Sequence, residues 1–254
     1  MSGVGIERQG RLAVLRLDKP RGNAIDEPLV EALARGAAEV AADPGVRGVL
    51  LASAHPKLFC PGLDLVTLSA YDRPSMERFM TAFAVMVWAL YGLPKPVVAA
   101  VSGAAVAGGC ILALTADHRV VKRGAPIGLN EVKIGVPLPW SVTRLVRATV
   151  PPSALSPIAL LGRNFADEEA VAAGLADEVR DAEGFEASCL ARLAEFAEKD
   201  PLALATTKAW LREGVLAEMM AHEAERLGAF LDGWFSPGTQ ERIRATVAAL
   251  RAKG

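Results

Sequence analysis

The sequence has few of the residues on which several common kinds of site depend. Its 254 residues include three cysteines and three histidines, and no Cys-x-x-Cys pair. Cysteines that are few, odd in number and widely spaced predict neither a disulfide framework nor a cysteine metal site, and they favour a reducing compartment. None of the histidines lies at ligand spacing from a cysteine or an acid. We therefore expect no metal site.

An excess of charge of either sign is also missing. Lysine and arginine number 28 and aspartate and glutamate 29, which gives a formal net charge of -1. This balance predicts no nucleic-acid partner and no anionic membrane partner. No apolar run has the length of a membrane span, because Lys95, Pro96 or glycines interrupt the longest ones. The first residues carry no charged segment followed by an apolar one, so we expect no secretory signal and a cytoplasmic protein.

The hydrophobic residues that are present, 52% of the chain, form two kinds of pattern. Apolar or alternating runs predict strands near residues 5–9, 12–17, 48–52, 97–101 and 117–121. Helical spacing predicts helices at 27–42 with Asp26 as the N-cap, from a Ser75 cap to just before Pro94, and at 139–149. After residue 152 the pattern is mostly helical. We expect an α/β core over residues 1–195 and a helical C-terminal region over 196–254.

A turn of small residues, 102–109, stands between the strand at 97–101 and an apolar helical run. The first N–H groups of a helix have no partner within it and favour a negative charge, such as a phosphate or an enolate oxygen. A phosphate loop would need Lys-Ser where Gly109-Cys110 stands. The dinucleotide fingerprint and the Gly-x-Ser-x-Gly elbow are absent too. Taken alone, the turn could simply permit close packing of helix on strand.

A second glycine turn, at residues 59–65 with the sequence Phe-Cys-Pro-Gly-Leu-Asp-Leu, precedes a predicted short helix. Asp64 is suited to cap that helix. One backbone N–H from each of the two turns could converge on a single oxygen. Such a pair is an oxyanion hole, which would stabilise a thioester enolate.

These two motifs, in this order, resemble those of the crotonase (enoyl-CoA hydratase/isomerase) superfamily. The segments 21–25 (Arg-Gly-Asn-Ala-Ile) and 232–241 resemble the family's motifs before its first and last helices, so the resemblance covers nearly the whole chain. It implies a spiral of ββα units with a C-terminal trimerisation region at 196–254. It also implies an acyl-CoA substrate, no separate cofactor, and homotrimers or dimers of trimers.

The resemblance also implies positions for the site. The oxyanion donors would be the backbone N–H groups of Leu63 and Gly108. The residues implied to contact the acyl-CoA are Asn23, Ala24, Lys57, Phe59, Ile111 and Trp140. Among them, Lys57 could equally be a solvated loop lysine, and Trp140 could be a core residue. Met76, Phe79, Met80 and Phe83 could line the acyl pocket, although a stripe of apolar residues at helical spacing is more often part of the core.

The acidic residues distinguish between the family's reactions. Hydratases of this superfamily use two glutamates, and the first of these positions holds Ile111 here. The second holds Glu131, which without the motif would be interpreted as a surface acid paired with Lys133. One carboxylate with an oxyanion hole suffices to move a proton from C2 to C4 of a 3-enoyl-CoA. An apolar environment would raise the pKa of this carboxyl.

The sequence that ends at Glu131 is Ile-Gly-Leu-Asn-Glu, and Pro-Leu-Pro-Trp follows at 137–140. Both segments resemble those of the short-chain 3,2-trans-enoyl-CoA isomerases. We therefore predict a Δ3,Δ2-enoyl-CoA isomerase of fatty-acid β-oxidation with Glu131 as its catalytic residue. The alternatives are a hydratase or another crotonase reaction, with a second acid such as Asp64 or Asp117, and an acyl-CoA-binding protein without turnover.

Overall fold

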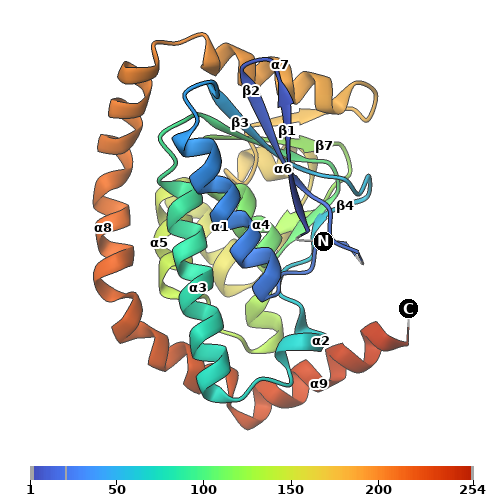
Figure 1. The fold of residues 1–254 in the computed structure, drawn as a ribbon. Helices are drawn as coiled ribbons and strands as arrows, with labels where there is room; N and C mark the ends of the chain where they lie inside the picture. The colour runs from blue at the N-terminus through green and yellow to red at the C-terminus, as the bar shows by residue number, and fades with distance from the viewer. Residues whose placement is uncertain (1–2, 21, 253–254) are drawn as a thin grey trace.

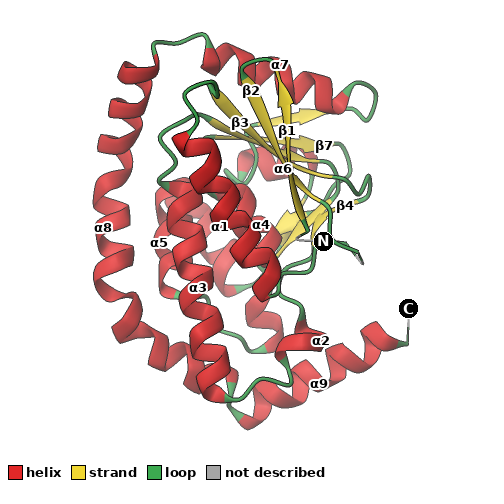
Figure 2. Ribbon diagram, in the orientation of Figure 1, coloured by secondary structure: helices red, strands yellow, loops and turns green. Residues whose placement is uncertain are grey.

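The computed structural model describes residues 3–20 and 22–252, so Arg21 of the predicted N-terminal motif lies outside the described residues. Within them the strands form two sheets, shown in yellow in Figure 2. The six-stranded sheet has the order β1 (Val4–Gln9), β2 (Leu12–Leu17), β3 (Gly48–Ser53), β5 (Val97–Val101), β7 (His118–Lys122) and β10 (Glu178–Arg180). The four-stranded sheet has the order β4 (Leu58–Cys60), β6 (Ala104–Val106), β8 (Ile127–Gly128) and β9 (Asn164–Phe165).

Most neighbouring strands run parallel. The exceptions are the pairs β1–β2 and β8–β9, which are antiparallel. Parallel sheets are covered on both faces, which explains why β3 and β5 are buried along their whole length. Val14, Leu50 and Val98 pack under α7 (Phe185–Ala197), whereas Leu15, Leu51 and Ala99 face the main core. The expected α/β class is confirmed.

Helices α1 (Glu27–Ala42), α3 (Arg73–Tyr91) and α5 (Trp140–Thr149) lie on the side of the main core (Figure 1). Asp26 caps α1, as predicted, by accepting from the N–H of Leu29 at 3.2 Å. The predicted cap of α3 is wrong. Asp72 caps this helix, and its carboxylate accepts from the N–H of Ser75 at 2.9 Å. Pro74 therefore lies in the first turn, and Ser75 is inside the helix instead of capping it.

The C-terminal part is mostly helical, as predicted, with the short strands β9 and β10 as exceptions. Its helices are α6 (Asp167–Ala172), α7, α8 (Pro201–Trp234) and α9 (Pro237–Arg251). Figure 1 shows α8 running along one edge of the molecule and α9 turning back beneath it toward α2 (Leu65–Leu68). The predicted boundary at residue 195 falls just before the end of α7, and the division into two regions stays a prediction. No helix among the described residues is long and apolar enough to cross a membrane.

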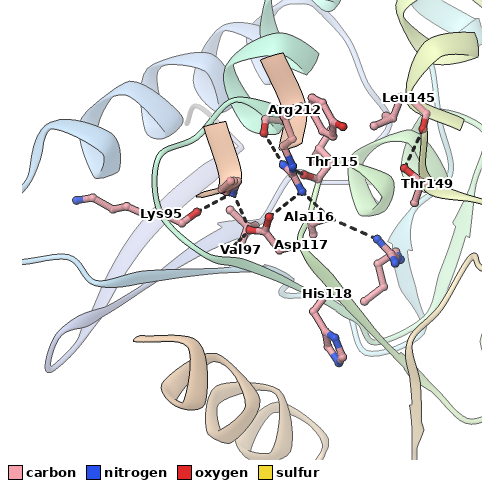
Figure 3. A network of polar contacts seen from close by, with 12 residues as sticks. Lys95, Val97, Thr115, Ala116, Asp117, His118, Leu145, Thr149 and Arg212 are labelled. Atoms are coloured by element: carbon pink, nitrogen blue, oxygen red, sulfur yellow. Dashed lines mark hydrogen bonds and ion pairs between the residues drawn. The ribbon is translucent and has the colours of Figure 1, made fainter. Parts of the chain in front are cut away.

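Asp117 joins α8 to the core (Figure 3). Its carboxylate accepts from the N–H of Val97 at 2.7 Å and pairs with Lys208 at 2.6 Å and Arg212 at 2.7 Å. Arg212 also donates to the carbonyl of Thr115, just past the end of α4 (Gly108–Leu114). Burial lowers the pKa of Lys208 to about 8. These contacts agree with the structural role expected for Asp117.

Candidate active site

The small-residue turn contains a strand that the sequence pattern did not indicate. We expected the strand at 97–101 to lead directly into the helix. Instead β6 intervenes and pairs with β4 and β8, and α4 starts at Gly108. The N–H of Ala107 donates to the carbonyl of Gly128 at 2.9 Å, and Ala107 has a φ of 49°, which turns the chain into α4. Within the described residues, the N–H of Gly108 has no hydrogen-bond partner.

The second turn is held by a parallel bridge between Ile25 and Leu63. The N–H of Ile25 donates to the carbonyl of Gly62, and the N–H of Asp64 donates to the carbonyl of Ile25, each at 2.8 Å. These two bonds flank Leu63, whose own N–H has no hydrogen-bond partner in the described chain. Asp64 then caps α2, as predicted, by accepting from the N–H of Thr67 at 3.1 Å.

Glycines allow the two turns to touch. A Cβ atom on Gly109 would lie 2.0 Å from the carbonyl oxygen of Cys60, and one on Gly62 would lie 3.0 Å from the nitrogen of Gly108. Gly62 also has a φ of 98°, which side chains rarely adopt. The unpaired N–H groups of Leu63 and Gly108 therefore belong to two loops in direct contact. Two unpaired N–H groups on touching loops are compatible with the predicted oxyanion hole, which stays a prediction.

Both turns border one large cavity of about 1160 Å³. Its wall is mostly apolar, with Leu65, Met80, Phe83, Ile111, Ile134, Val136, Pro139, Phe230 and Trp234. Its polar members include Asp64, Thr67, Asn130, Glu131, Lys133 and Arg251. A concave apolar site with a few polar groups is typical of a small-molecule site.

Glu131 is the buried acid of this cavity. It opens the 3₁₀ turn η1 (Glu131–Ile134), and 8% of its surface is exposed. Burial raises the pKa of its carboxyl to about 7, against smaller opposing effects from the N–H groups of Glu131 and Asn130. Its Oε2 atom is buried without a hydrogen-bond partner among the described residues, and no ion pair between Glu131 and Lys133 is found in that part of the chain. An unpaired carboxyl that titrates near neutrality is suited to exchange protons with a bound molecule.

Five of the predicted site residues lie together in the cavity wall: Ala24, Leu63, Gly108, Ile111 and Glu131. Ile111 is an apolar member of this wall, so the first hydratase position provides no acid. The charge of Glu131 raises the pKa of the neighbouring Cys110 thiol, after the larger effect of burial.

The other four predicted residues are outside that wall. Asn23 is fully buried, and its side chain donates to Ser53 and to the carbonyl of Phe59, each at 2.9 Å. Phe59 itself is a core residue, and Lys57 is an exposed loop residue. Trp140 donates from Nε1 to the carbonyl of Glu218 at 3.0 Å and stacks beneath Arg144. Their predicted contacts with an acyl-CoA stay predictions.

The cavity wall also includes residues from the C-terminal helices that the sequence did not indicate. These are Phe230 and Trp234 from α8 and Thr246, Leu250 and Arg251 from α9. The two rings of α8 are stacked with centroids 6.3 Å apart. The motif at 232–241 includes Trp234, and it was the one sequence feature that pointed to this part of the chain. No group of three or more His, Cys, Asp or Glu in the described residues could hold a metal ion.

Comparison with known proteins identifies the family. The family model for enoyl-CoA hydratase/isomerase matches residues 7–232. The chain belongs to the enoyl-CoA hydratase/isomerase family. This confirms the predicted crotonase superfamily and the crotonase fold.

This family member resembles proteins of more than one named activity. It is 31% identical over 222 residues to carnitinyl-CoA dehydratase of Salmonella typhi, a match that covers 87% of this chain and 84% of the relative. It superposes on human mitochondrial delta3-delta2-enoyl-CoA isomerase with a TM-score of 0.91 at 25% identity, over 99% of each chain. For an enoyl-CoA hydratase of Mycobacterium marinum the TM-score is 0.82 at 28% identity, over 89% of this chain and 98% of that one. The choice among reactions therefore depends on the site.

Proposed function

We propose that this enzyme is a Δ3,Δ2-enoyl-CoA isomerase, which converts a 3-enoyl-CoA to the 2-trans-enoyl-CoA as in fatty-acid β-oxidation. The observation that supports this most is that the cavity holds a buried carboxyl, Glu131, whose Oε2 atom has no partner among the described residues, together with an isoleucine at position 111. Adding water across a double bond calls for two groups that handle protons on opposite sides of one water. Moving a double bond calls for one group that removes and returns a proton.

In the proposed reaction the thioester oxygen accepts from the N–H groups of Leu63 and Gly108. The Glu131 carboxylate takes a proton from C2, and the electron pair of that C–H bond delocalises into a dienolate whose charge rests on the thioester oxygen. The dienolate then takes the proton back from the Glu131 carboxyl at C4, and the double bond forms between C2 and C3. Every atom of the substrate is conserved, so coenzyme A acts only as the carrier of the acyl group and no separate cofactor is needed.

The pKa of Glu131 suits both steps. A base with a pKa of about 7 is ionised in part at neutral pH, and its conjugate acid returns the proton readily. General acid–base catalysis supplies roughly 10²–10⁴-fold in rate. Each oxyanion donor supplies roughly 10²–10³-fold.

One observation favours a second candidate, an acyl-CoA hydratase or dehydratase. Asp64 is a second carboxylate in the cavity wall, and a curated relative is a dehydratase. However, Asp64 caps α2, and its Oδ2 atom lies 3.6 Å from Nζ of Lys19. The same Nζ atom pairs with Oδ2 of Asp26 at 2.7 Å. The Asp64 carboxylate is thus already bound by the N-terminus of α2 and lies beside Lys19, whereas Oε2 of Glu131 has no partner among the described residues.

The test is turnover of 3-cis- and 3-trans-enoyl-CoA of several chain lengths, compared with hydration of crotonyl-CoA by the same preparation. We expect conjugated 2-trans product from a 3-enoyl-CoA at a rate well above that of hydration. Hydration at a comparable or higher rate would favour the second candidate. Thermal stabilisation by acyl-CoA with no turnover of either substrate would instead indicate a binding protein. Homotrimers or dimers of trimers and a cytoplasmic location belong to the same proposal.

A further inference from the structure

The Glu131 carboxyl lacks a side chain that orients it. Its Oε2 atom has no hydrogen-bond partner, and no ion pair to it occurs among the described residues. The position of the carboxyl in the cavity is therefore set by the backbone of η1. This segment is a single 3₁₀ turn that ends at Gly135, whose φ is 78°.

The peptide between Gly135 and Val136 is fixed at both of its polar atoms. The N–H of Val136 donates to the carbonyl of Glu131 at 3.1 Å. The carbonyl of Gly135 accepts from the hydroxyl of Thr239, on α9, at 2.9 Å. One peptide unit thus connects α9 to the backbone of Glu131.

The direction of the Thr239 hydroxyl bond is determined by its neighbours. The N–H of Thr239 donates to the Ser236 hydroxyl at 3.4 Å, and the Ser236 hydroxyl donates to Thr239 Oγ1 at 3.0 Å. Because Thr239 Oγ1 accepts this hydrogen bond, its own hydroxyl hydrogen is available to the carbonyl of Gly135. Thr239 is 3% exposed, so water cannot easily replace it.

Helix α8 makes a second contact with the same segment. A Cβ atom on Gly233 would lie 2.8 Å from Cγ of Pro137, so the helix backbone packs directly against the residues that follow η1. The corner between α8 and α9 therefore encloses the segment 131–137.

We propose that Thr239 is a positioning residue for Glu131, acting through the Gly135–Val136 peptide. The proposal rests on the proposed role of Glu131 as the base. Without the hydroxyl, the carbonyl of Gly135 is left buried and unpaired, η1 shifts, and water gains access to the carboxyl.

The test compares Thr239→Val, which keeps the shape and removes the donor, with Thr239→Ser, which keeps the donor. Thr149→Val is the matched control, because Thr149 donates to the carbonyl of Leu145 at 2.8 Å in α5 without contacting η1. Two readouts are needed: kcat and KM for a 3-enoyl-CoA, and titration of the Glu131 carboxyl by infrared difference spectroscopy against Glu131→Gln.

For T239V we expect kcat to fall about tenfold with KM changed by less than about twofold, and the pKa of the Glu131 carboxyl to fall toward its ordinary value. T239S and T149V should match the wild type in both readouts. An unchanged titration in T239V, or an equal loss of kcat in T149V, would overturn the proposal.

Failure of the two proposals can be told apart. If the wild type turns over no 3-enoyl-CoA, the proposed function fails, and the infrared titration still decides whether Thr239 positions Glu131. If T239V does not fold, Thr239→Ala removes the same hydroxyl with a smaller side chain. It should give the same fall in kcat and the same change in titration, and wild-type behaviour in both would overturn the proposal.

Discussion

A Cβ atom on Gly62 would lie 3.0 Å from the backbone nitrogen of Gly108. These two residues come from turns separated in the chain by α2, α3 and β5, and their contact brings the loops of the proposed oxyanion hole together. The relationship leaves no room for a side chain at position 62.

Gly62→Ala should therefore lower kcat by about 10²-fold, with a smaller effect on KM, because a displaced donor loses its bond to the oxyanion. Steady-state kinetics with a 3-enoyl-CoA checks this. Gly10→Ala is the matched control, since Gly10 has a φ of 61° but no atom within 4 Å of its would-be Cβ. Equal kcat values for the two variants would contradict the proposed contact.

Ile111→Glu would place a second carboxyl in the cavity wall. We expect this variant to hydrate crotonyl-CoA faster than the wild type, because a second acid–base group can then act on one water. Ile111→Gln, which has a similar shape and cannot ionise, is the control. If I111E and I111Q hydrate at the same rate, the identity of residue 111 does not separate the two reactions.

The stability of the fold should depend on pH through Glu131. Its pKa rises from 4.5 to about 7 on folding, so the folded state binds the proton more tightly, and stability falls as pH rises from 4.5 through 7. Glu131→Gln carries no charge to bury. It should match the wild type near pH 4.5 and exceed it above pH 7 by up to about 3 kcal/mol. Urea unfolding at several pH values measures this difference in the free energy of unfolding. A difference that stays the same at every pH would contradict the prediction.

Asp117→Asn should destabilise the protein by about 3–5 kcal/mol, because Lys208 and Arg212 would be left buried with no anion. Chemical unfolding checks the value. Glu31→Ala removes one side of an exposed pair with Arg35, whose N···O distance is 3.4 Å, and should change stability by less than about 1 kcal/mol. A D117N variant as stable as E31A would show that Asp117 does not anchor α8.

The sequence was most informative where the determinants are local. Hydrophobic patterning located β2, β3, β5 and α1 to within a residue or two, since one buried face gives α1 its helical period and burial on both faces gives β3 and β5 continuous apolar runs. The Ser75 cap was wrong because Asp72 offers a competing acceptor three residues earlier. The short strand β6 was missed because three small residues carry no alternation, and its partners β4 and β8 are distant in sequence.

The same distinction applies to the site. Glu131, Leu63 and Gly108 came from the resemblance of their motifs to the crotonase superfamily, although their placement depends on long-range contacts such as the Ile25–Leu63 bridge. Contributions of Trp234 and Arg251 to the cavity depend on how α8 and α9 turn back over the core, and periodicity does not specify such tertiary contacts. Asn23 lies beside the cavity-lining Ala24, but internal hydrogen bonds hold its side chain in the core.

The central claim is that one carboxyl, Glu131, moves the proton. The most direct measurement is kcat for a 3-enoyl-CoA with the wild type and with Glu131→Gln, together with a check that the variant is folded. We expect kcat to fall by about 10²–10⁴-fold in the variant. A folded E131Q variant that retains the wild-type kcat would contradict it.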